Sequence, residues 1–175
     1  MTDGPAKTNT LECPPVRLPR CSLSELLDWY IKNLCDAEIL DPRGYRVLFT
    51  PERFPHLIKL VKKSGKPVSK PAKVVKQILN GELCEADFGG FDQERAFGLT
   101  WIRPIIERPT KIIAASGELF DKAGDTLLVK QFKKGGFKFK ILVCRKQGPK
   151  LLVPVTCHPR DHDRFPKGHR HIWPL

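Results

Sequence analysis

Five side chains in this sequence could together carry out acid–base chemistry on a phosphate: His56, Lys130, Arg145, Thr156 and His158. A histidine with an ordinary pKa of about 6.5 can accept or donate a proton at neutral pH. Lysine and arginine stabilise the charge that develops on a phosphate in the transition state. In RNA, a base removes the ribose 2′-OH proton, the oxygen attacks the adjacent phosphate, and an acid protonates the leaving 5′ oxygen. These residue types therefore fit a metal-independent ribonuclease, although a lone histidine is more often structural or simply exposed.

Motifs of other site classes are absent from the sequence, which has no carboxylate pair, nucleophile elbow, phosphate loop or His-Glu-x-x-His zinc motif. The last 22 residues hold a cysteine and four histidines: Cys157, His158, His162, His169 and His171. Their spacing matches no common zinc finger, so we expect neither a metal nor another cofactor. Three interpretations of this segment stay open: a zinc site, a wall that contacts phosphate and includes a catalytic His158, or a solvated tail that docks through Ile172 and Trp173. The third is favoured.

The positive charge is large and unevenly distributed. The chain has 31 Lys and Arg against 19 Asp and Glu, a net charge of +12. Residues 57–80 hold 7 lysines and no acid, residues 81–125 hold 9 acids and 5 bases, and residues 126–175 hold 12 bases and 2 acids. This segregation favours a positive face that binds a polyanion, because neutralised phosphates release counterions. A lysine-rich solvated surface is the simpler explanation.

Further cations are predicted to contact RNA: Arg53, Lys59, Lys62, Lys63, Lys138 and Lys140. In the segment FKFKILV, strand alternation puts the apolar side chains on one face and both lysines on the other; the apolar set is Phe137, Phe139, Ile141 and Val143. We expect one face of the sheet to pack against helices and the other to offer the lysines to a ligand.

The N-terminal half carries helix signals. Ser22 and Glu25 have the spacing of a capping box, and Thr50 with Pro51 opens a second helix. PAKVVKQIL is a third helix, which ends at Gly81. The segment from 91 to 109 predicts a helix to about Arg103, kinked or ended by Pro104.

The C-terminal half alternates with a period of two. The segments KIIAA, TLLVKQF, FKFKILVC and KLLVPVTC read as strands, and Gly135-Gly136 makes a hairpin turn. The predicted class is therefore α+β, with N-terminal helices packed on a C-terminal antiparallel meander. Residues 1–20 are expected to be a flexible arm and residues 21–175 a single domain.

Six cysteines without a C-x-x-C pair are typical of small buried side chains in a reducing compartment. No apolar run approaches the roughly 20 residues that span a bilayer. We expect a cytoplasmic protein without membrane contact.

Several short motifs resemble a known nuclease group: YRVLFTPERFPHLIKL, IIERPTKI, TLLVKQF, FKILVCRK and VPVTCHP. Together, from Arg46 to His158, they are similar to the phage-associated branch of the barnase/EndoU/colicin/RelE-like fold. The resemblance implies an RNase-toxin-like domain and matches it at Arg53, His56, Lys130, Arg145 and Thr156, with His158 just beyond the usual threonine. The chain departs from the group in lacking a second histidine at KLVKK and in inserting the acidic stretch LCEADFGGFDQERAF.

Three functions follow as hypotheses. The leading one is a toxin-type RNA endonuclease that acts by 2′-OH attack on the adjacent phosphate. The second is a nucleic-acid-binding module of the same fold without catalysis, because a fold can persist without its chemistry. The third is an interaction domain whose Lys59–Lys76 segment binds an acidic partner, such as an inhibitor or immunity protein.

Overall fold

The computed structural model describes residues 22–114, 126–132, 138–158 and 170–173. The predicted arm, the Gly135-Gly136 turn, His162 and His169 lie outside the described residues. No helix in the described part of the chain is both long and apolar enough to cross a membrane.

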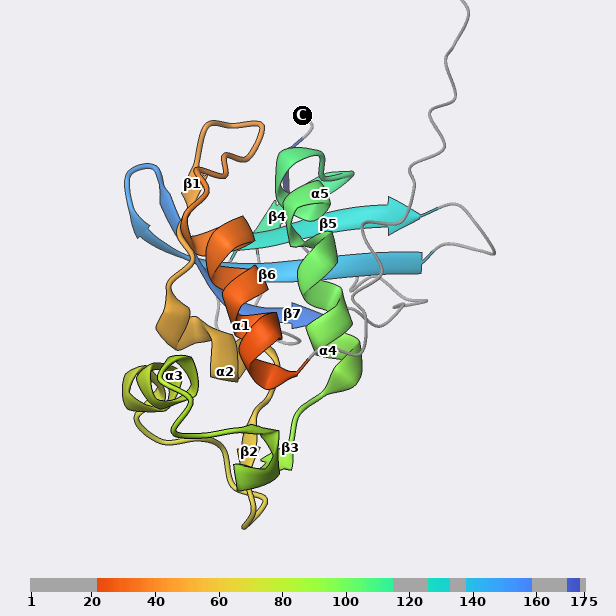
Figure 1. Cartoon of the computed structure of the whole chain (residues 1–175). Helices are drawn as coiled ribbons and strands as arrows, with labels where there is room; N and C mark the ends of the chain where they lie inside the picture. Colours follow the sequence, from red (N-terminus) through yellow and green to blue (C-terminus); the bar gives the residue numbers. More distant parts are fainter. Residues whose placement is uncertain (1–21, 115–125, 133–137, 159–169, 174–175) are drawn as a thin grey trace, which may run out of the picture.

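A six-stranded mixed sheet, in the order β1-β7-β6-β5-β4-β8, is the centre of the described structure (Figure 1). Its strands are β1 (Arg46–Val47), β4 (Lys111–Ala114), β5 (Thr126–Phe132), β6 (Lys138–Gly148), β7 (Leu151–His158) and β8 (Arg170–Trp173). The four middle strands form the predicted antiparallel meander. The sheet is not purely antiparallel, however, because β1 joins β7 in parallel. The end of the chain returns as β8, antiparallel to β4, so the main chain of the terminal segment docks on the sheet.

The helices cover one face of this sheet and extend below it (Figure 1). They are α1 (Leu23–Tyr30) continuing into η1 (Ile31–Cys35), η2 (Pro51–Arg53), α2 (Phe54–Leu57), α3 (Pro71–Leu79), η3 (Glu85–Asp87), α4 (Gln93–Gly98), η4 (Leu99–Trp101) and α5 (Ile102–Glu107). The α+β class is therefore confirmed. The capping box is present, since Ser22 Oγ accepts from the Glu25 N–H and the Ser22 N–H donates to Glu25 Oε2.

Two helices differ from the sequence prediction at their ends. The helix expected to stop near Arg103 continues to Glu107 as α5. Between α4 and α5 the chain forms the 3₁₀ helix η4, so Pro104 falls in the first turn of α5, where the missing N–H of proline breaks no helix hydrogen bond. The second helix is short, because after α2 the chain adopts a left-handed conformation at Lys59 (φ 51°) and enters a strand.

A second, smaller sheet projects from the helical side. It pairs β2 (Val61–Lys62) with β3 (Phe88–Gly90), antiparallel. Together with α3 it forms the lower part of the molecule in Figure 1. The acidic stretch of residues 83–97 therefore supplies β3 to the small sheet and most of α4, which packs against β7 of the main sheet.

Buried side chains lie on both faces of the main sheet. Between helices and sheet, Tyr30, Phe54 and Leu142 belong to a large apolar core. On the opposite face Ile113, Val129, Ile141 and Val143 form a second buried cluster. The sheet therefore does not leave one face open for ligand, contrary to the expectation from alternation.

Candidate functional site

Lys130 and Lys140 lie directly opposite each other in the ladder between β5 and β6. Both point to the helix side, where Lys130 Nζ donates to the Arg108 carbonyl at 2.9 Å and Lys140 Nζ lies 5.1 Å from the centre of the Trp101 ring. The expectation that the lysine face points away from the helices is therefore wrong. Alternation fixes which residues share a face, but the packing of η4 and α5 decides which face is covered. Like charges placed opposite each other in a sheet repel, so the helix contacts help to hold this pair.

Arg95 on α4 reaches the same end of the sheet. Its side chain is only 12% exposed, and its Nη1 donates to Thr156 Oγ1 at 3.0 Å. Its Nε lies 3.7 Å from Asp92 Oδ2, and the other oxygen of Asp92 caps α4 by accepting the Arg95 N–H. The arginine is thereby fixed between a helix cap and a strand that are 61 residues apart in sequence.

The buried thiol of Cys157 shows that these cations converge. Burial raises the pKa of Cys157 to about 12, while the charges of Lys140 and Arg95 act in the opposite direction. Both positive charges therefore act on the same buried thiol. The thiol stays protonated at neutral pH and is not a nucleophile there.

We call Arg95, Lys130, Lys140, Thr156 and Trp101 the Arg95 cluster. It holds three cations, all of them half-buried. Asp92 is the carboxylate in ion-pair contact with Arg95. Because charges near a protein interior are screened less than in water, such an arrangement is suited to an added anion. The Thr156 hydroxyl accepts from Arg95 and keeps its own proton to donate. A phosphate group has the charge and the acceptor oxygens for this set.

The other predicted catalytic residues are placed differently. Arg145 pairs with Val153 and, by alternation, shares the face of Ile141 and Val143, so the sheet separates it from Lys130 and Lys140. His56 is exposed on α2, and no contact links it to the Arg95 cluster within the described residues. His158 ends β7 opposite Ile141, and its side chain lies outside the described part. Thus the two lysines share the helix-side face, whereas Thr156, paired with Val143, lies with Arg145 on the other face and is linked to the helices by its hydrogen bond with Arg95.

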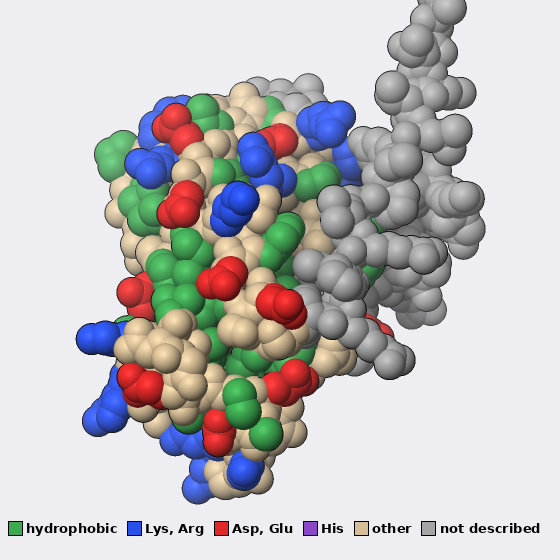
Figure 2. Space-filling view, in the orientation of Figure 1, with side chains coloured by type: hydrophobic (Ala, Val, Ile, Leu, Met, Phe, Trp, Pro, Cys, Tyr) green, Lys and Arg blue, Asp and Glu red, His purple; other side chains and the backbone are tan. Residues whose placement is uncertain are grey.

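A second basic region contains the predicted binding lysines. We call residues 59–76 together with β3 the lysine lobe. Its lysines are all exposed: Lys59, Lys62, Lys63, Lys66, Lys70, Lys73 and Lys76. In Figure 2, blue side chains follow the left and lower edges of this region, with red ones between them. The lobe presents many cations on a surface open to solvent.

The acidic stretch partly neutralises this lobe. Backbone and side-chain hydrogen bonds with Cys84 lower the pKa of Asp87, and the charge of Lys63 contributes. The pairing of β2 with β3 therefore brings together charges that are segregated along the sequence. Of the remaining predicted contacts, Arg53 is half-buried near Tyr30, and the side chain of Lys138 lies outside the described residues.

The lobe and the Arg95 cluster are adjacent. The Asp92 N–H donates to the Ile58 carbonyl at 2.9 Å, which places the start of α4 against the residue before Lys59. The lobe and the cluster therefore meet at the start of α4.

Sequence reasoning missed Arg95, Asp92 and Trp101. The spacing of Asp92 and Arg95 is readable as a helix cap, since an aspartate commonly accepts an N–H from the first turn. Nothing local indicates that Arg95 meets Thr156 or that Trp101 meets Lys140.

No protein-family model, curated protein or solved structure matches this chain.

Proposed function

We propose that this protein binds RNA, with one backbone phosphate in the Arg95 cluster and neighbouring phosphates along the lysine lobe. The observation that carries this proposal is that the half-buried Arg95 contacts the Thr156 hydroxyl and that Arg95 and Lys140 both act on the buried thiol of the next residue, Cys157. An opposite charge placed near half-buried cations favours their charged form and is itself stabilised by them. A phosphate supplies that anion, and the half-buried Trp101 ring offers an aromatic surface next to it.

The lysine lobe supports an extended polyanion over a small anionic ligand. Seven exposed lysines in residues 59–76 far exceed the needs of one phosphate. Each lysine that neutralises a phosphate releases counterions, so affinity should fall steeply with salt. Among macromolecules, a nucleic acid best provides phosphates at regular spacing.

RNA cleavage is the second candidate function. Arg95 contacts Thr156, and His158 follows two residues later on the same strand and the same face. Arg95 would stabilise the charge on phosphorus, while a histidine accepts the 2′-OH proton and a proton is donated to the leaving 5′ oxygen. In this reaction the 2′ oxygen forms a bond to phosphorus, the bond to the 5′ oxygen breaks, and a 2′,3′-cyclic phosphate remains. The resemblance to the phage-associated nuclease group supports a toxin-type enzyme of this kind.

The test uses the full chain and a fluorescent single-stranded RNA, in EDTA, at salt concentrations of about 50 to 200 mM. We expect binding to weaken by orders of magnitude over this range if six or more phosphates are contacted. If the second candidate holds, gels from the same samples should show cleavage that EDTA does not suppress, with cyclic phosphate ends. An RNA affinity that does not change with salt concentration would contradict the first proposal. Cleavage that requires added metal would contradict the second.

A further inference from the structure

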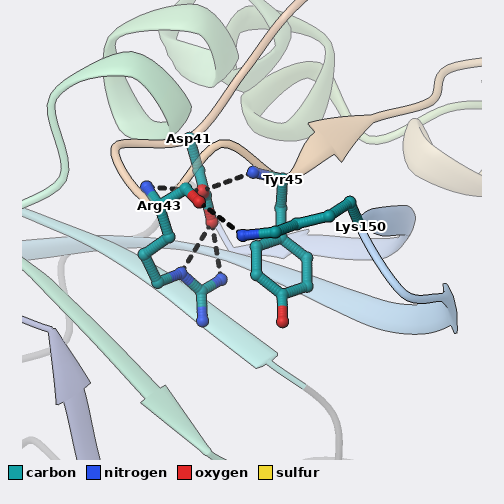
Figure 3. A network of polar contacts seen from close by, with 4 residues as sticks. All are labelled: Asp41, Arg43, Tyr45 and Lys150. Atoms are coloured by element: carbon teal, nitrogen blue, oxygen red, sulfur yellow. Dashed lines mark hydrogen bonds and ion pairs between the residues drawn. The ribbon is translucent and has the colours of Figure 1, made fainter.

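A network around Asp41 fixes a loop at the other end of β7 (Figure 3). Asp41 is 3% exposed, and its carboxylate accepts two backbone N–H groups, from Arg43 and Tyr45, and two guanidinium N–H groups from Arg43. Gly44 allows the turn, with φ of 76° and its N–H on the Asp41 carbonyl. The guanidinium of Arg43 is thereby held in one orientation, with Nε and Nη2 on Asp41 and Nη1 not used in these bonds.

The turn between β6 and β7 is tied to this loop. Lys150 Nζ donates to the Arg43 carbonyl at 2.9 Å, as Figure 3 shows, and the Arg46 N–H donates to the Lys150 carbonyl at 2.9 Å. The two connections therefore form one rigid corner, built by residues more than 100 positions apart. Side chains on either segment keep a fixed relation to those on the other.

Three cations surround the ring of Tyr45 in this corner. Arg43 Cζ lies 4.5 Å from the ring centre, Lys150 Nζ 4.7 Å and Lys146 Nζ 5.8 Å. All three distances are within the range of a cation–π contact, worth about 0.5–1 kcal/mol at an exposed site. The three positive groups also repel each other, because they lie within roughly a Debye length.

The charge balance of the corner is incomplete. Asp41 compensates one positive charge, that of Arg43. Lys146 and Lys150 are both exposed and have no ion pair among the described residues, and Arg46 at the start of β1 adds a further exposed cation. A purely structural corner would need only Asp41, Arg43 and the backbone bonds. The two lysines beside the same ring add repulsion. Of the two, only Lys150 contributes a hydrogen bond to the loop, to the Arg43 carbonyl.

We propose that Arg43, Tyr45, Lys146 and Lys150 form a binding site for a phosphomonoester group, which we call the Tyr45 site. A phosphomonoester carries a charge of about −1.5 to −2 at pH 7 and three acceptor oxygens. That charge matches the two cations that Asp41 leaves uncompensated, whereas an internal phosphodiester carries only one charge. The fixed guanidinium offers Nη1, Lys146 offers an ammonium group on a flexible side chain, and Lys150, bound to the Arg43 carbonyl, keeps further ammonium protons to donate.

The Tyr45 site is distinct from the Arg95 cluster. It lies at the start of β7, near Leu151, and the cluster lies near Thr156. Five residues of extended strand separate these positions by about 16 Å. If the protein binds RNA as proposed above, the Tyr45 site would accept the 5′-terminal phosphate of that RNA. This choice of RNA as the source of the phosphate rests on the proposed function.

The first arm of the test measures inorganic phosphate alone. The melting temperature of the full chain is followed as phosphate replaces chloride at constant ionic strength. We expect phosphate to raise the melting temperature in the wild type and in Lys32→Gln/Arg103→Gln, a control with the same charge loss at exposed positions outside all the proposed sites, and to give a much smaller rise in Lys146→Gln/Lys150→Gln. Equal stabilisation of all three proteins, or of none, would overturn the site. If the double variant fails to fold, the single variant Lys146→Gln takes its place, because Lys146 makes none of the hydrogen bonds of the loop described above. Lys146→Gln should reduce the rise in melting temperature with phosphate by at least half.

The second arm compares one RNA oligonucleotide with a 5′-phosphate or a 5′-hydroxyl. The phosphorylated form should bind about three- to tenfold more tightly, as two exposed charge contacts allow, and the Lys146→Gln/Lys150→Gln variant should lose this ratio. A ratio of one, with phosphate still stabilising the wild type, would overturn the RNA source and support a small phosphomonoester as ligand. If neither RNA binds, the proposed function fails, while the first arm still decides the Tyr45 site.

Discussion

The Arg95 cluster and the lysine lobe are both positively charged, but they hold their charge in different ways. Arg95 is 12% exposed and contacts Asp92 and Thr156, whereas the lobe's seven lysines are exposed. In the cluster, helix α4 and strand β7 fix Arg95, and the two lysines contact η4 and the end of α5. In the lobe, flexible side chains extend from a small sheet and from α3.

This difference separates two kinds of electrostatic binding. Exposed lysines are screened by salt and act mainly through their number. A few half-buried cations act at one point, where a low effective dielectric strengthens each contact and geometry selects the ligand group. The lobe is therefore expected to set how tightly RNA binds, and the cluster which phosphate is positioned for chemistry.

The largest expected effect comes from Arg95. If the protein cleaves RNA, as the second candidate function proposes, Arg95→Ala should lower the cleavage rate about a hundredfold, as expected for loss of a charge-stabilising donor. Arg95→Lys should recover only part of the rate, because an ammonium cannot contact Asp92 and Thr156 in the same planar geometry. Single-turnover rates with saturating protein measure this, with melting curves to confirm folding.

Arg103→Ala is the matched control, since this arginine forms an exposed ion pair with Glu107 on α5. It removes the same charge and should leave the rate within a few-fold of the wild type. Equal losses in Arg95→Ala and Arg103→Ala would mean that net charge alone matters, and the distinction between cluster and lobe would disappear.

The lobe should give a smaller effect with a different dependence on salt. Lys73→Gln/Lys76→Gln should weaken RNA binding by about tenfold near 100 mM salt. It should also reduce the slope of log affinity against log salt by about 0.7 for each phosphate of the single strand that the variant no longer neutralises. Binding titrations at four or more salt concentrations measure both values. Lys32→Gln/Arg103→Gln has the same charge change on other exposed positions, and an equal reduction of the slope there would argue against a defined lysine surface.

Local sequence signals predicted most of the fold. Ser22 and Glu25 form the expected capping box because every contact lies within one helical turn. The meander followed from the period of two in successive segments. The contact of β1 with β7 could not be read in this way, since Arg46 pairs with Leu151 far along the chain. The parallel pairing that makes the sheet mixed is a long-range contact, and no local sequence pattern predicts it.

The candidate site was less predictable than the fold. Lys130, Lys140 and Thr156 were identified from residue type and strand position, but their partners Arg95 and Trp101 come from helices distant in sequence. Alternation grouped Lys140 with the correct neighbours and left open which face the helices cover. Because buried residues such as Leu142 and Ile141 lie on both faces of the sheet, the pattern of polar and apolar residues does not show which face the helices cover.

Gly89→Ala tests whether the lobe depends on its small sheet. A Cβ at this position would lie 2.6 Å from the Lys62 carbonyl oxygen, so the backbone of β2 must move. We expect the pairing of β2 with β3 to break, RNA affinity to fall by a few-fold and the main core to stay folded. Hydrogen exchange of the Lys62 and Gly90 amides would report the local change.

Gly148→Ala is the control for that substitution, since its Cβ would meet only Leu151 Cβ at an ordinary 3.6 Å. It should change neither exchange in the lobe nor RNA affinity. Unchanged exchange in Gly89→Ala as well would show that β2 and β3 tolerate the side chain, and the lobe would not need this sheet.

The smallest expected effect is the response of the lobe to acid. Hydrogen bonding with Cys84, assisted by Lys63, lowers the pKa of Asp87 below the ordinary 3.8. A carboxylate whose pKa is lowered in the folded chain contributes its full stabilisation at pH values above its ordinary pKa. This stabilisation is lost as the pH falls through the lower pKa of the folded state. Acidification from pH 5 to below pH 3 should therefore loosen the Cys84–Asp87 turn. The Cys84 amide shift, followed by NMR, should titrate in this range, and Asp87→Asn should remove that step. A Cys84 shift that titrates equally in Asp87→Asn would show that another carboxylate controls the turn, and the lobe would lose its internal counter-charge.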